Sequence, residues 1–164
     1  MLREGASLEV RSSGKRGSGL YAAEQIRLGE VIRTIIIVRE VTADAPLAAH
    51  EAADRCTRID GRIYLVGEPD CFVNHACEPS AYKRYAEGGV HMVAMRDIGA
   101  GDEITYDYMM NTDGGDAWPC ACGSARCRGS TSASYFDLPP RVQARYRPYL
   151  AEWFVAAHLD RFPS

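Results

Sequence analysis

The residues that most directly indicate chemistry are three cysteines in the short stretch 119–129, PCACGSARCRG. Their spacing, Cys-x-Cys-x4-Cys, allows the sulfurs to turn toward one centre, because Gly123 and Gly129 permit sharp bends of the backbone. Thiolates are preferred zinc ligands, and a structural zinc takes four ligands in a tetrahedron. The stretch therefore predicts a metal site that is one ligand short. The three cysteines are Cys120, Cys122 and Cys127.

The local spacing does not identify the fourth ligand. The remaining candidates are the cysteines Cys56, Cys71 and Cys77 and the four histidines. Six cysteines could instead form three disulfides in a secreted protein, but the opening MLREGASLEV lacks the apolar core of a signal peptide, which favours metal binding. Reduced thiols in a flexible tail are a second alternative, and a redox pair would favour Cys-x-x-Cys.

Two further motifs place polar side chains where a site could form. FVNHACEP, residues 72–79, ends an apolar run in Asn74 and His75. GDEITYDY, residues 101–108, holds two tyrosines two positions apart. On a strand, such side chains leave the same face, so both phenols can line one narrow pocket. Each motif also has an ordinary explanation, namely a satisfied polar pair at a strand end or tyrosines packed at a core edge.

The elements that must position these residues are mostly short strands, which predicts a mostly β or α+β fold. A helical segment follows the cysteines and is divided near Pro148. We predict strands over 8–13, 30–41, 62–67, 89–98 and 103–108, a buried segment over 71–76, a short helix over 44–56, a loop over 109–129 and a helical tail over 138–162. An apolar stripe that packs on the domain is predicted from Tyr146, Leu150, Trp153, Phe154, Ala157 and Leu159.

Length and composition exclude several classes of function. With 164 residues, the chain is expected to form one domain. Its 19 basic and 22 acidic residues give a net charge of −3, which argues against a general nucleic-acid binder. No apolar run in the sequence approaches the roughly 20 residues that span a bilayer, so no membrane contact is predicted.

In their order along the chain, four motifs resemble a SET domain protein-lysine methyltransferase with a zinc-binding post-SET segment, of the SET1/trithorax-like branch. The motifs are RGSGLYA, FVNHACEP, GDEITYDY and CACGSARCRG, and the resemblance covers about residues 8–130. It implies a SET-domain fold of short curved β-sheets, with a pseudoknot-like crossing of the Asn-His segment under the last strand. It also implies a SET domain at 1–112, a post-SET zinc-binding segment at 113–130 and a C-terminal helical extension at 131–164.

The same resemblance implies roles for individual residues. Tyr108 corresponds to the catalytic tyrosine of a methyl transfer from S-adenosylmethionine to a lysine amine. Tyr106 is the second catalytic residue, at a position that governs the product and where a hydroxyl favours monomethylation. Zinc is expected to bind Cys77, Cys120, Cys122 and Cys127. Cys56 and Cys71 are then expected to be small buried residues. The cofactor is expected to contact Arg16, Gly17, Ser18, Gly19, Leu20, Asn74, His75 and Tyr106.

The expected partner is a protein or peptide that presents a lysine, either a histone tail or another basic protein, without direct contact to nucleic acid or membrane. A catalytically idle SET-like module that binds proteins is the alternative function. A zinc hydrolase fits poorly, because four cysteine ligands leave no open metal position for water. A bacterial chain is expected in the cytoplasm, or outside the cell if it is a secreted effector. A eukaryotic chain is expected in the nucleus.

Three positions depart from the family pattern. Ala76 and Ser80 replace a serine and an asparagine of the family, and Arg55 stands near a position where the family has tyrosine. Because the region around Arg55 forms one wall of the substrate groove in the family, the departure concerns the identity of the substrate more than the chemistry.

Overall fold

The computed structural model describes residues 5–14 and 17–162, in which ten short strands carry most of the regular structure. The strands are β1 (Leu8–Ser12), β2 (Ser18–Ala22), β3 (Val31–Thr34), β4 (Ile37–Val41), β5 (Cys56–Ile59), β6 (Arg62–Val66), β7 (Asn74–His75), β8 (Ala81–Ala86), β9 (Gly89–Ala94) and β10 (Glu103–Tyr106). The α-helices of the described residues are α1 (Pro140–Tyr146) and α2 (Glu152–Ala157). Single turns of 3₁₀ helix are η2 (Ala53–Arg55), η3 (Asp70–Phe72), η4 (Tyr135–Asp137), η5 (Arg147–Tyr149) and η6 (Leu159–Arg161).

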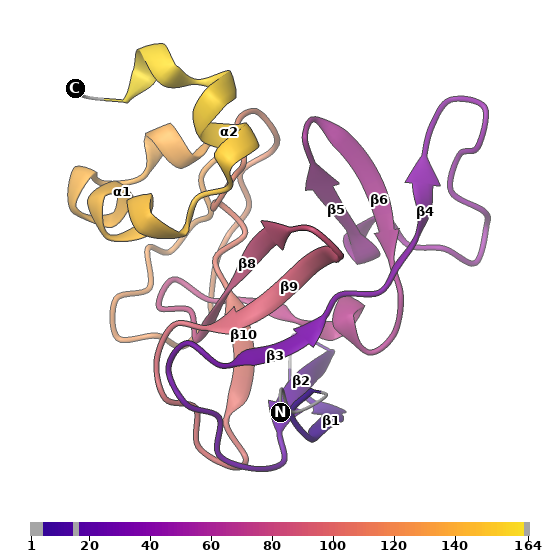
Figure 1. Cartoon of the computed structure of the whole chain (residues 1–164), viewed down its shortest axis with the longest axis vertical. Coiled ribbons are helices and arrows are strands. Elements are labelled where there is room, and N and C mark those ends of the chain that lie inside the picture. The colour runs from indigo at the N-terminus through magenta and orange to yellow at the C-terminus, as the bar shows by residue number, and fades with distance from the viewer. Residues whose placement is uncertain (1–4, 15–16, 163–164) are drawn as a thin grey trace.

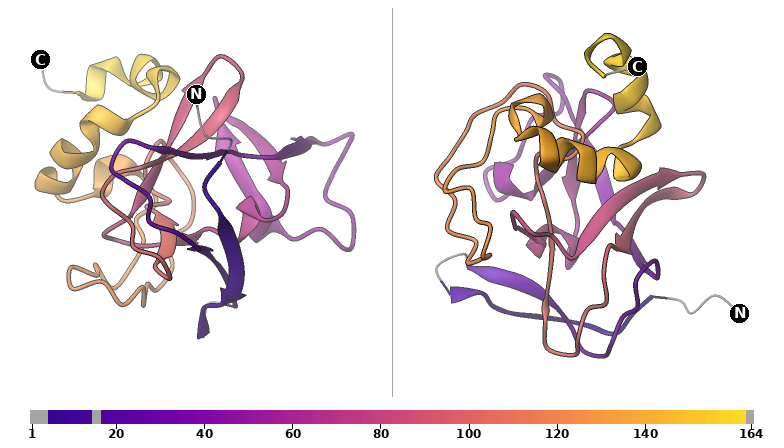
Figure 2. Two further views of the ribbon diagram at one scale, coloured as in Figure 1. Left: turned by 60° about the horizontal axis from the view of Figure 1, so that its bottom comes forward. Right: turned by 90° about the vertical axis from the view of Figure 1, so that its left-hand side faces the viewer.

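The strands form three small sheets (Figure 1). The first has the order β1-β2-β10-β7, the second β3-β9-β8 and the third β4-β6-β5. The helices α1 and α2 lie at the opposite end of the molecule from β1 and β2, and the two further views agree (Figure 2). Short strands in several small sheets, with few helices, agree with the predicted mostly β class.

One parallel pairing joins distant parts of the chain. β7 pairs with β10, so that Asn74 lies beside Thr105. His75 likewise lies beside Tyr106, and the N–H of Ala76 donates to the carbonyl of Tyr106. Because a parallel pair cannot be closed by a tight turn, the intervening chain makes the β8–β9 hairpin before it returns. The pairing places the Asn-His motif against the tyrosine motif, as the predicted crossing requires.

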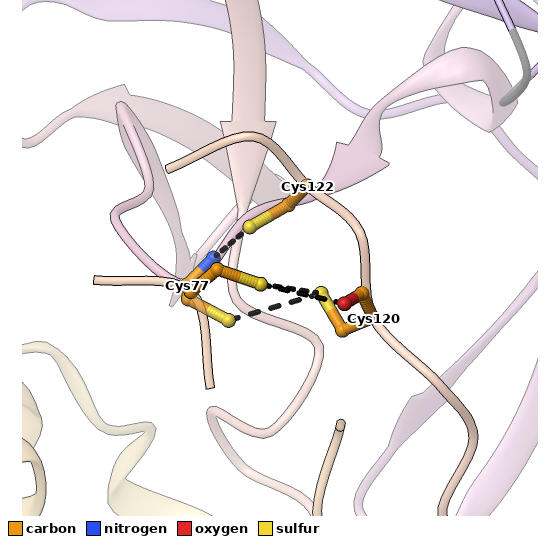
Figure 3. A group of neighbouring side chains, drawn as sticks. Cys77, Cys120 and Cys122 are labelled. Carbon is orange, nitrogen blue, oxygen red and sulfur yellow. Dashed lines mark hydrogen bonds between the residues drawn. The ribbon is translucent and has the colours of Figure 1, made fainter. Parts of the chain in front are cut away.

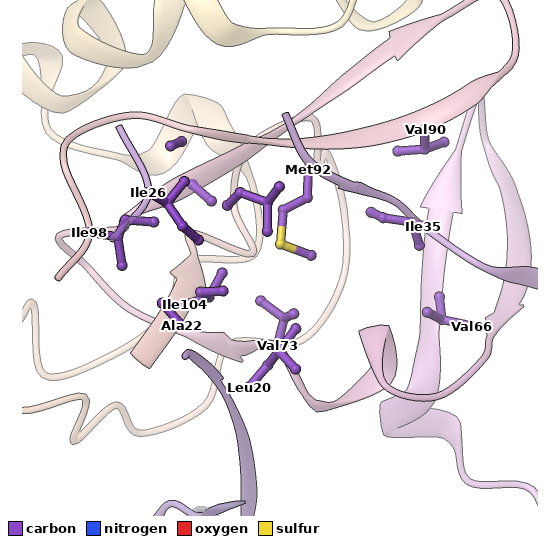
Figure 4. Close-up of a cluster of buried hydrophobic side chains, with 13 residues drawn as sticks. Leu20, Ala22, Ile26, Ile35, Val66, Val73, Val90, Met92, Ile98 and Ile104 are labelled. Carbon is purple, nitrogen blue, oxygen red and sulfur yellow. The ribbon is translucent and has the colours of Figure 1, made fainter. Parts of the chain in front are cut away.

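The main hydrophobic core lies between the first two sheets (Figure 4). Its strand residues come from β2 and β10 on one side and from β3, β8 and β9 on the other, with Val66 of β6 at the margin. Leu20 and Ile104 are fully buried, and burial of such a side chain contributes about 1.5–3 kcal/mol relative to exposure. The core therefore fixes β2 and β10, the two strands from which the candidate site is built.

The predicted single strand over 30–41 is wrong, because the chain changes sheets in its middle. β3 pairs with β9, whereas β4 pairs with β6. Between the two strands Ile35 points into the core, and the N–H of Ile36 donates to the carboxylate of Asp70 at 2.8 Å. The backbone group that would continue the strand is therefore bound by a side chain from η3.

The predicted helix over 44–56 is also wrong, and only Ala53–Arg55 forms a turn of 3₁₀ helix there. The guanidinium of Arg39 donates to the carbonyls of Ala45 and Pro46, at 2.8 and 2.9 Å. These carbonyls would otherwise accept hydrogen bonds along a helix, and Pro46 has no N–H to donate. A side chain from β4 thus holds the segment as a loop.

The C-terminal helices pack on a second cluster of buried side chains that follows β10. Its members are Met109, Met110, Tyr135, Leu138, Tyr146, Ala151 and Phe154. The helical tail is divided at η5, as predicted, but the apolar stripe is shorter than predicted because Leu159 is 67% exposed and Ala157 is also exposed. Between β10 and α1 the predicted loop is present, with no helix or strand over 109–129 in the described chain. None of the described helices has the length and apolar character to cross a membrane.

Candidate functional site

The two tyrosines of GDEITYDY come together beside β7. β10 ends at Tyr106 rather than at Tyr108 as predicted, yet the two rings lie on the same side with centroids 4.8 Å apart. The hydroxyl of Tyr108 donates to the carbonyl of Val73 at 2.9 Å, which fixes the end of its ring. His75 meets the Tyr108 ring edge-on, with centroids 5.3 Å apart. The aromatic pair is therefore held in one orientation by the Asn-His segment.

Both tyrosines line a cavity of about 220 Å³. Its other walls come from β5, from β8 and from the loop after β10. Trp118 stands at the cavity, 44% exposed, with its ring centroid 6.4 Å from that of Tyr108. Segments that are distant in sequence thus line one pocket, in which four tyrosines and Trp118 stand among polar side chains.

Lys83 of β8 also lines the pocket, and the sequence reasoning gave it no role. Its Nζ donates to the hydroxyl of Tyr106 at 2.9 Å and to that of Thr57 at 2.7 Å. Part of the side chain faces the pocket, but the amine lies deep among protein atoms, and this burial lowers the pKa of Lys83. Burial also raises the pKa of Tyr106. The rarity of lysine is a signal that could have identified Lys83, since only two of the 19 basic residues are lysines.

The glycine turn before β2 lies against the Asn-His segment from the other side. The side-chain amide of Asn74 donates to the carbonyl of Ser18 at 3.0 Å and to the carboxylate of Glu103 at 2.8 Å. A Cβ at Gly19 would collide with the carboxylate of Glu103, so any other residue here would displace the partner of the Asn74 amide. Gly17 has φ +77°, a conformation that glycine adopts readily.

Two of the residues expected at this turn are placed differently. Leu20 is fully buried in the core, so only its backbone can line a groove. Arg16 lies outside the described residues. The structure thus brings Gly17, Ser18 and Gly19 together with Asn74 through backbone and amide groups.

His75 is buried, with 7% of its surface exposed, and both ring nitrogens face protein atoms. Nδ1 accepts a hydrogen bond from the N–H of Tyr108 at 3.1 Å. Nδ1 also lies 3.5 Å from the carboxylate of Asp107, and Nε2 lies 3.5 Å from the sulfur of Cys77. The imidazole therefore links the tyrosine motif to the cysteine cluster, and any contact with a cofactor falls to its backbone.

The sulfurs of four cysteines lie within 4.8 Å of one another, and the cysteines are Cys77, Cys120, Cys122 and Cys127. Figure 3 shows Cys120 and Cys122 approaching Cys77 from the loop. The sulfur of Cys120 is 3.8 Å from that of Cys77 and 3.9 Å from that of Cys127. A tetrahedral zinc with Zn–S bonds of 2.3 Å has sulfurs about 3.8 Å apart. The donor set and its spacing therefore fit a structural zinc.

Backbone N–H groups also point at these sulfurs. The N–H of Arg128 lies 3.4 Å from the sulfur of Cys77, and the N–H of Cys77 lies 3.5 Å from that of Cys122. Burial raises the pKa of Cys77 to about 12, whereas for Cys122 the Cys77 N–H and the Ser124 hydroxyl outweigh burial and lower the pKa to about 6. Without a cation these neighbouring thiols cannot all be ionised, so binding a metal would displace their protons.

The other two cysteines, Cys56 and Cys71, lie apart from the cluster. Both are partly exposed rather than fully buried as expected. Burial raises the pKa of each thiol, which is the behaviour of an inert cysteine.

Asp107, between the two tyrosines, is a second residue that the sequence reasoning missed. Its carboxylate is fully buried and forms an ion pair with Arg128 at 2.8 Å. It also accepts a hydrogen bond from the hydroxyl of Tyr146 at 2.8 Å. The alternation in TYDY could have revealed it, because the aspartate must face inward when the tyrosines face the pocket. Asp107 thereby joins the end of β10 to the cysteine loop and to α1.

A model of the SET domain matches residues 17–109 of the chain. Histone-lysine N-methyltransferase 2B of Homo sapiens is 32% identical over 135 residues, which cover 73% of this chain and 5% of that protein. The H3 lysine-4 specific histone-lysine N-methyltransferase of Kluyveromyces lactis is 44% identical over 127 residues, which cover 68% of this chain and 13% of that protein. Trithorax of Drosophila melanogaster is 30% identical over 125 residues, 68% of this chain and 3% of that protein.

A solved structure gives the same result for the fold. The crystal structure of KRYPTONITE in complex with mCHG DNA and SAH aligns with a TM-score of 0.64 and 25% identity, over 79% of this chain and 30% of that one. The residues matched by the SET model make up more than half of the chain and run from the glycine turn through the Asn-His segment to both pocket tyrosines. The chain belongs to the SET domain family.

Proposed function

We propose that the chain is a protein-lysine N-methyltransferase that uses S-adenosylmethionine. The observation that carries the proposal is the aromatic pocket, in which Tyr106 and Tyr108 meet at the Asn-His segment. The similar proteins of Homo sapiens and Kluyveromyces lactis are named histone-lysine N-methyltransferases, and the similar KRYPTONITE structure contains SAH. These relatives are much longer than this chain, so their names support the reaction without fixing the substrate.

The reaction needs a neutral lysine amine, in line with a methyl group. S-adenosylmethionine, when bound, supplies an electrophilic methyl on a sulfonium. A free lysine has a pKa of about 10.4, so the pocket must favour its neutral form. The pocket already lowers the pKa of the chain's own Lys83 by burial, and a substrate amine that enters beside it loses water in the same way. No carboxylate base is then required.

The pocket residues orient the amine and exclude water. The Tyr108 hydroxyl, which donates to the carbonyl of Val73, would orient the attacking nitrogen. The Tyr106 hydroxyl forms the wall beside it. We assign to Tyr106 a preference for monomethylation, because a polar group at this wall occupies space that a second methyl group would need.

The cofactor is assigned to the glycine turn. The backbone of Gly17, Ser18 and Gly19, with Asn74 beside it, forms a polar cradle, and a Cβ at Gly19 would displace the Glu103 carboxylate that accepts from Asn74. Arg16, Leu20, His75 and Tyr106 complete the proposed set. For Leu20 and His75 the contact is assigned to the backbone, because their side chains are buried in protein.

A zinc ion is assigned to Cys77, Cys120, Cys122 and Cys127. It would act as a structural link, because four thiolates leave no position for water or substrate. Because the zinc ligand Cys77 lies two residues from His75, the ion would connect the loop that carries Trp118 to the pocket. On this basis we keep the division into a SET domain at 1–112, a post-SET segment at 113–130 and a helical extension at 131–164.

The proposed substrate is a lysine of a basic protein, such as a histone tail. Asp54 and Asp116 line the pocket and would attract a basic residue beside the target lysine, whereas Arg58 in the same lining would attract an acidic one. The net charge of −3 also favours a cationic protein over nucleic acid as the partner. By this proposal the chain acts in the nucleus of a eukaryotic cell, or in the cytoplasm of a bacterium or in the host it infects.

The test is transfer of labelled methyl from S-adenosylmethionine to a panel of basic peptides. Wild type should label at least one peptide, and Tyr108→Phe should lose at least about 100-fold in rate while it still binds the cofactor. Tyr64→Phe, on β6 and outside the pocket lining, is the matched control and should keep the wild-type rate. Cofactor binding by wild type without transfer to any peptide would instead favour the idle protein-binding module.

A further inference from the structure

We propose that Lys83 is a positioning residue that limits the number of methyl groups transferred, because it holds the hydroxyl of Tyr106 at the wall of the pocket. This inference rests on the proposed methyltransferase function and adds a determinant of its product. Lys83 lies on β8 and lines the pocket together with Thr57 of β5 and Tyr106 of β10.

The contacts of Lys83 are directed at the pocket wall. Its Nζ lies 2.9 Å from the Tyr106 hydroxyl and 4.1 Å from the centre of that ring. The second partner, the hydroxyl of Thr57 on β5, lies at 2.7 Å. The Lys83 amine therefore connects the Tyr106 hydroxyl of β10 to the Thr57 hydroxyl of β5. Thr57 lies 26 positions before Lys83 in the sequence, and Tyr106 lies 23 positions after it.

The hydrogen bonds do not depend on whether Lys83 is charged. A neutral amine has two N–H donors, and its two partners use both, whereas an ammonium has one more. The other groups around it are the carboxylate of Asp70 and the phenol of Tyr85, which both favour the charged form against burial. An ammonium donates to the Tyr106 oxygen, whereas a neutral amine can also accept the phenol proton; in both states the 2.9 Å contact holds the Tyr106 hydroxyl at the wall.

The Tyr106 hydroxyl and Lys83 Nζ make one wall of the pocket polar and leave no space between them for a methyl group. A neutral lysine amine has two N–H groups beside its attacking lone pair, and it can turn one toward the Tyr108 oxygen and the other toward this wall. A monomethyl-lysine that attacks a second time has only one N–H left, and when the Tyr108 oxygen takes it, the methyl group lies against the Tyr106 oxygen and Lys83 Nζ, which strips these groups of a hydrogen-bonding partner. A penalty of this kind corresponds to a second transfer about 10- to 100-fold slower than the first. Lys83 thereby reinforces the monomethylation assigned to Tyr106.

The test compares product distributions by mass spectrometry at equal conversion of one peptide. Lys83→Met keeps an unbranched side chain of similar length but cannot donate, and it should raise the ratio of dimethyl to monomethyl product by about 10-fold or more. Arg84→Met changes the next, exposed residue of β8 in the same way and should leave the ratio at the wild-type value. Tyr106→Phe should raise the ratio, and Lys83→Met added to it should change it no further.

The outcomes separate this inference from the proposed function. An active Lys83→Met enzyme with the wild-type product ratio overturns the role of Lys83 and leaves the methyltransferase function standing. A wild-type protein that methylates no peptide overturns both. If Lys83→Met does not fold, as judged by thermal unfolding, Lys83→Gln carries the test, because its amide is one bond too short to reach the Tyr106 hydroxyl. The ratio should then rise in Lys83→Gln, and an unchanged ratio overturns the inference.

Discussion

The sulfur of Cys77 lies 3.8 Å from the sulfur of Cys120, although 43 residues separate the two cysteines in the sequence. Cys77 lies two residues after the end of β7, and His75 of that strand contacts both Cys77 and Tyr108. The cysteine loop and the aromatic pocket therefore meet through one short segment. A substitution in the cysteine cluster should consequently change the rate of methyl transfer at the pocket.

We expect Cys77→Ser to lose most of its zinc. A serine hydroxyl is not ionised at neutral pH and is a poor fourth ligand, so three thiolates remain. Metal analysis after dialysis should find about one zinc per wild-type chain and far less in the variant, together with slower methyl transfer. Cys56→Ser, a cysteine outside the cluster, should retain wild-type zinc. Full zinc in Cys77→Ser would move the fourth ligand elsewhere.

We expect Asp107→Asn to be strongly destabilising. The buried carboxylate balances Arg128, whose side chain is 13% exposed, and accepts the hydroxyl of Tyr146. Removing one charge leaves the other buried without compensation, which costs about 3–5 kcal/mol. Denaturant unfolding measures the change in the free energy of unfolding.

Glu78→Gln is the matched control for Asp107→Asn. The carboxylate of Glu78 pairs with Arg126 at 3.7 Å, and that arginine side chain is 73% exposed. Such a surface pair contributes less than about 1 kcal/mol. Equal effects of the two variants would contradict a structural role of Asp107 in joining β10 to the cysteine loop.

The motifs of the sequence predicted the composition of the site better than its connections. The spacing of Cys120, Cys122 and Cys127 indicates a metal, but nothing local could select Cys77 as the residue that joins them. Cys77 reaches the three loop cysteines because β7 pairs with β10, and this pairing depends on the whole fold. Only the family resemblance supplied this information at the level of sequence.

The errors in the predicted elements have the same origin. The segment 44–56 has helical spacing, but Arg39 of another strand binds its carbonyls. Lys83 was missed for a similar reason, since its partners Thr57 and Tyr106 come from two other strands. Local patterns predict which strands form, whereas contacts between side chains of different sheets decide where they end and which polar groups they bury.

We expect Gly19→Ala to weaken cofactor binding. An added Cβ would collide with the carboxylate of Glu103 and approach the Cβ of Ser13 to 3.0 Å. Glu103 would have to move, although it accepts hydrogen bonds from Asn74 and Ser13, both at 2.8 Å. Calorimetric titration with S-adenosylmethionine should show at least about 10-fold weaker binding, with thermal unfolding as the check on the fold. Unchanged affinity in a folded variant would remove the glycine turn from the proposed cofactor site.

We expect Asp113 to give the C-terminal extension a pH-dependent stability. The Ser134 hydroxyl at 2.7 Å lowers the pKa of Asp113, as does the guanidinium of Arg161 at 2.9 Å. A depressed pKa means that this stabilisation is complete above the unfolded value of about 3.9 and is lost as the pH falls through the lower folded value. The carboxylate is 30% exposed, so solvent screening limits the contribution to about 1 kcal/mol or less.

Denaturant unfolding of wild type and Asp113→Asn at constant ionic strength measures this contribution. At pH 7 the wild type should have the larger free energy of unfolding, and the difference should shrink as the pH falls below about 4. Comparing the two proteins at each pH cancels the loss of metal and the protonation of other carboxylates, which both proteins share, whereas the contact of Asp113 with the imidazole of His158, at 3.1 Å, is part of the difference that is measured. Because Asp113 bridges the start of the loop after β10 to η6 through Arg161, the shrinking difference reports the docking of the helical tail. A difference that stays constant from pH 7 to pH 3 would mean that the Asp113 carboxylate does not hold that tail in place.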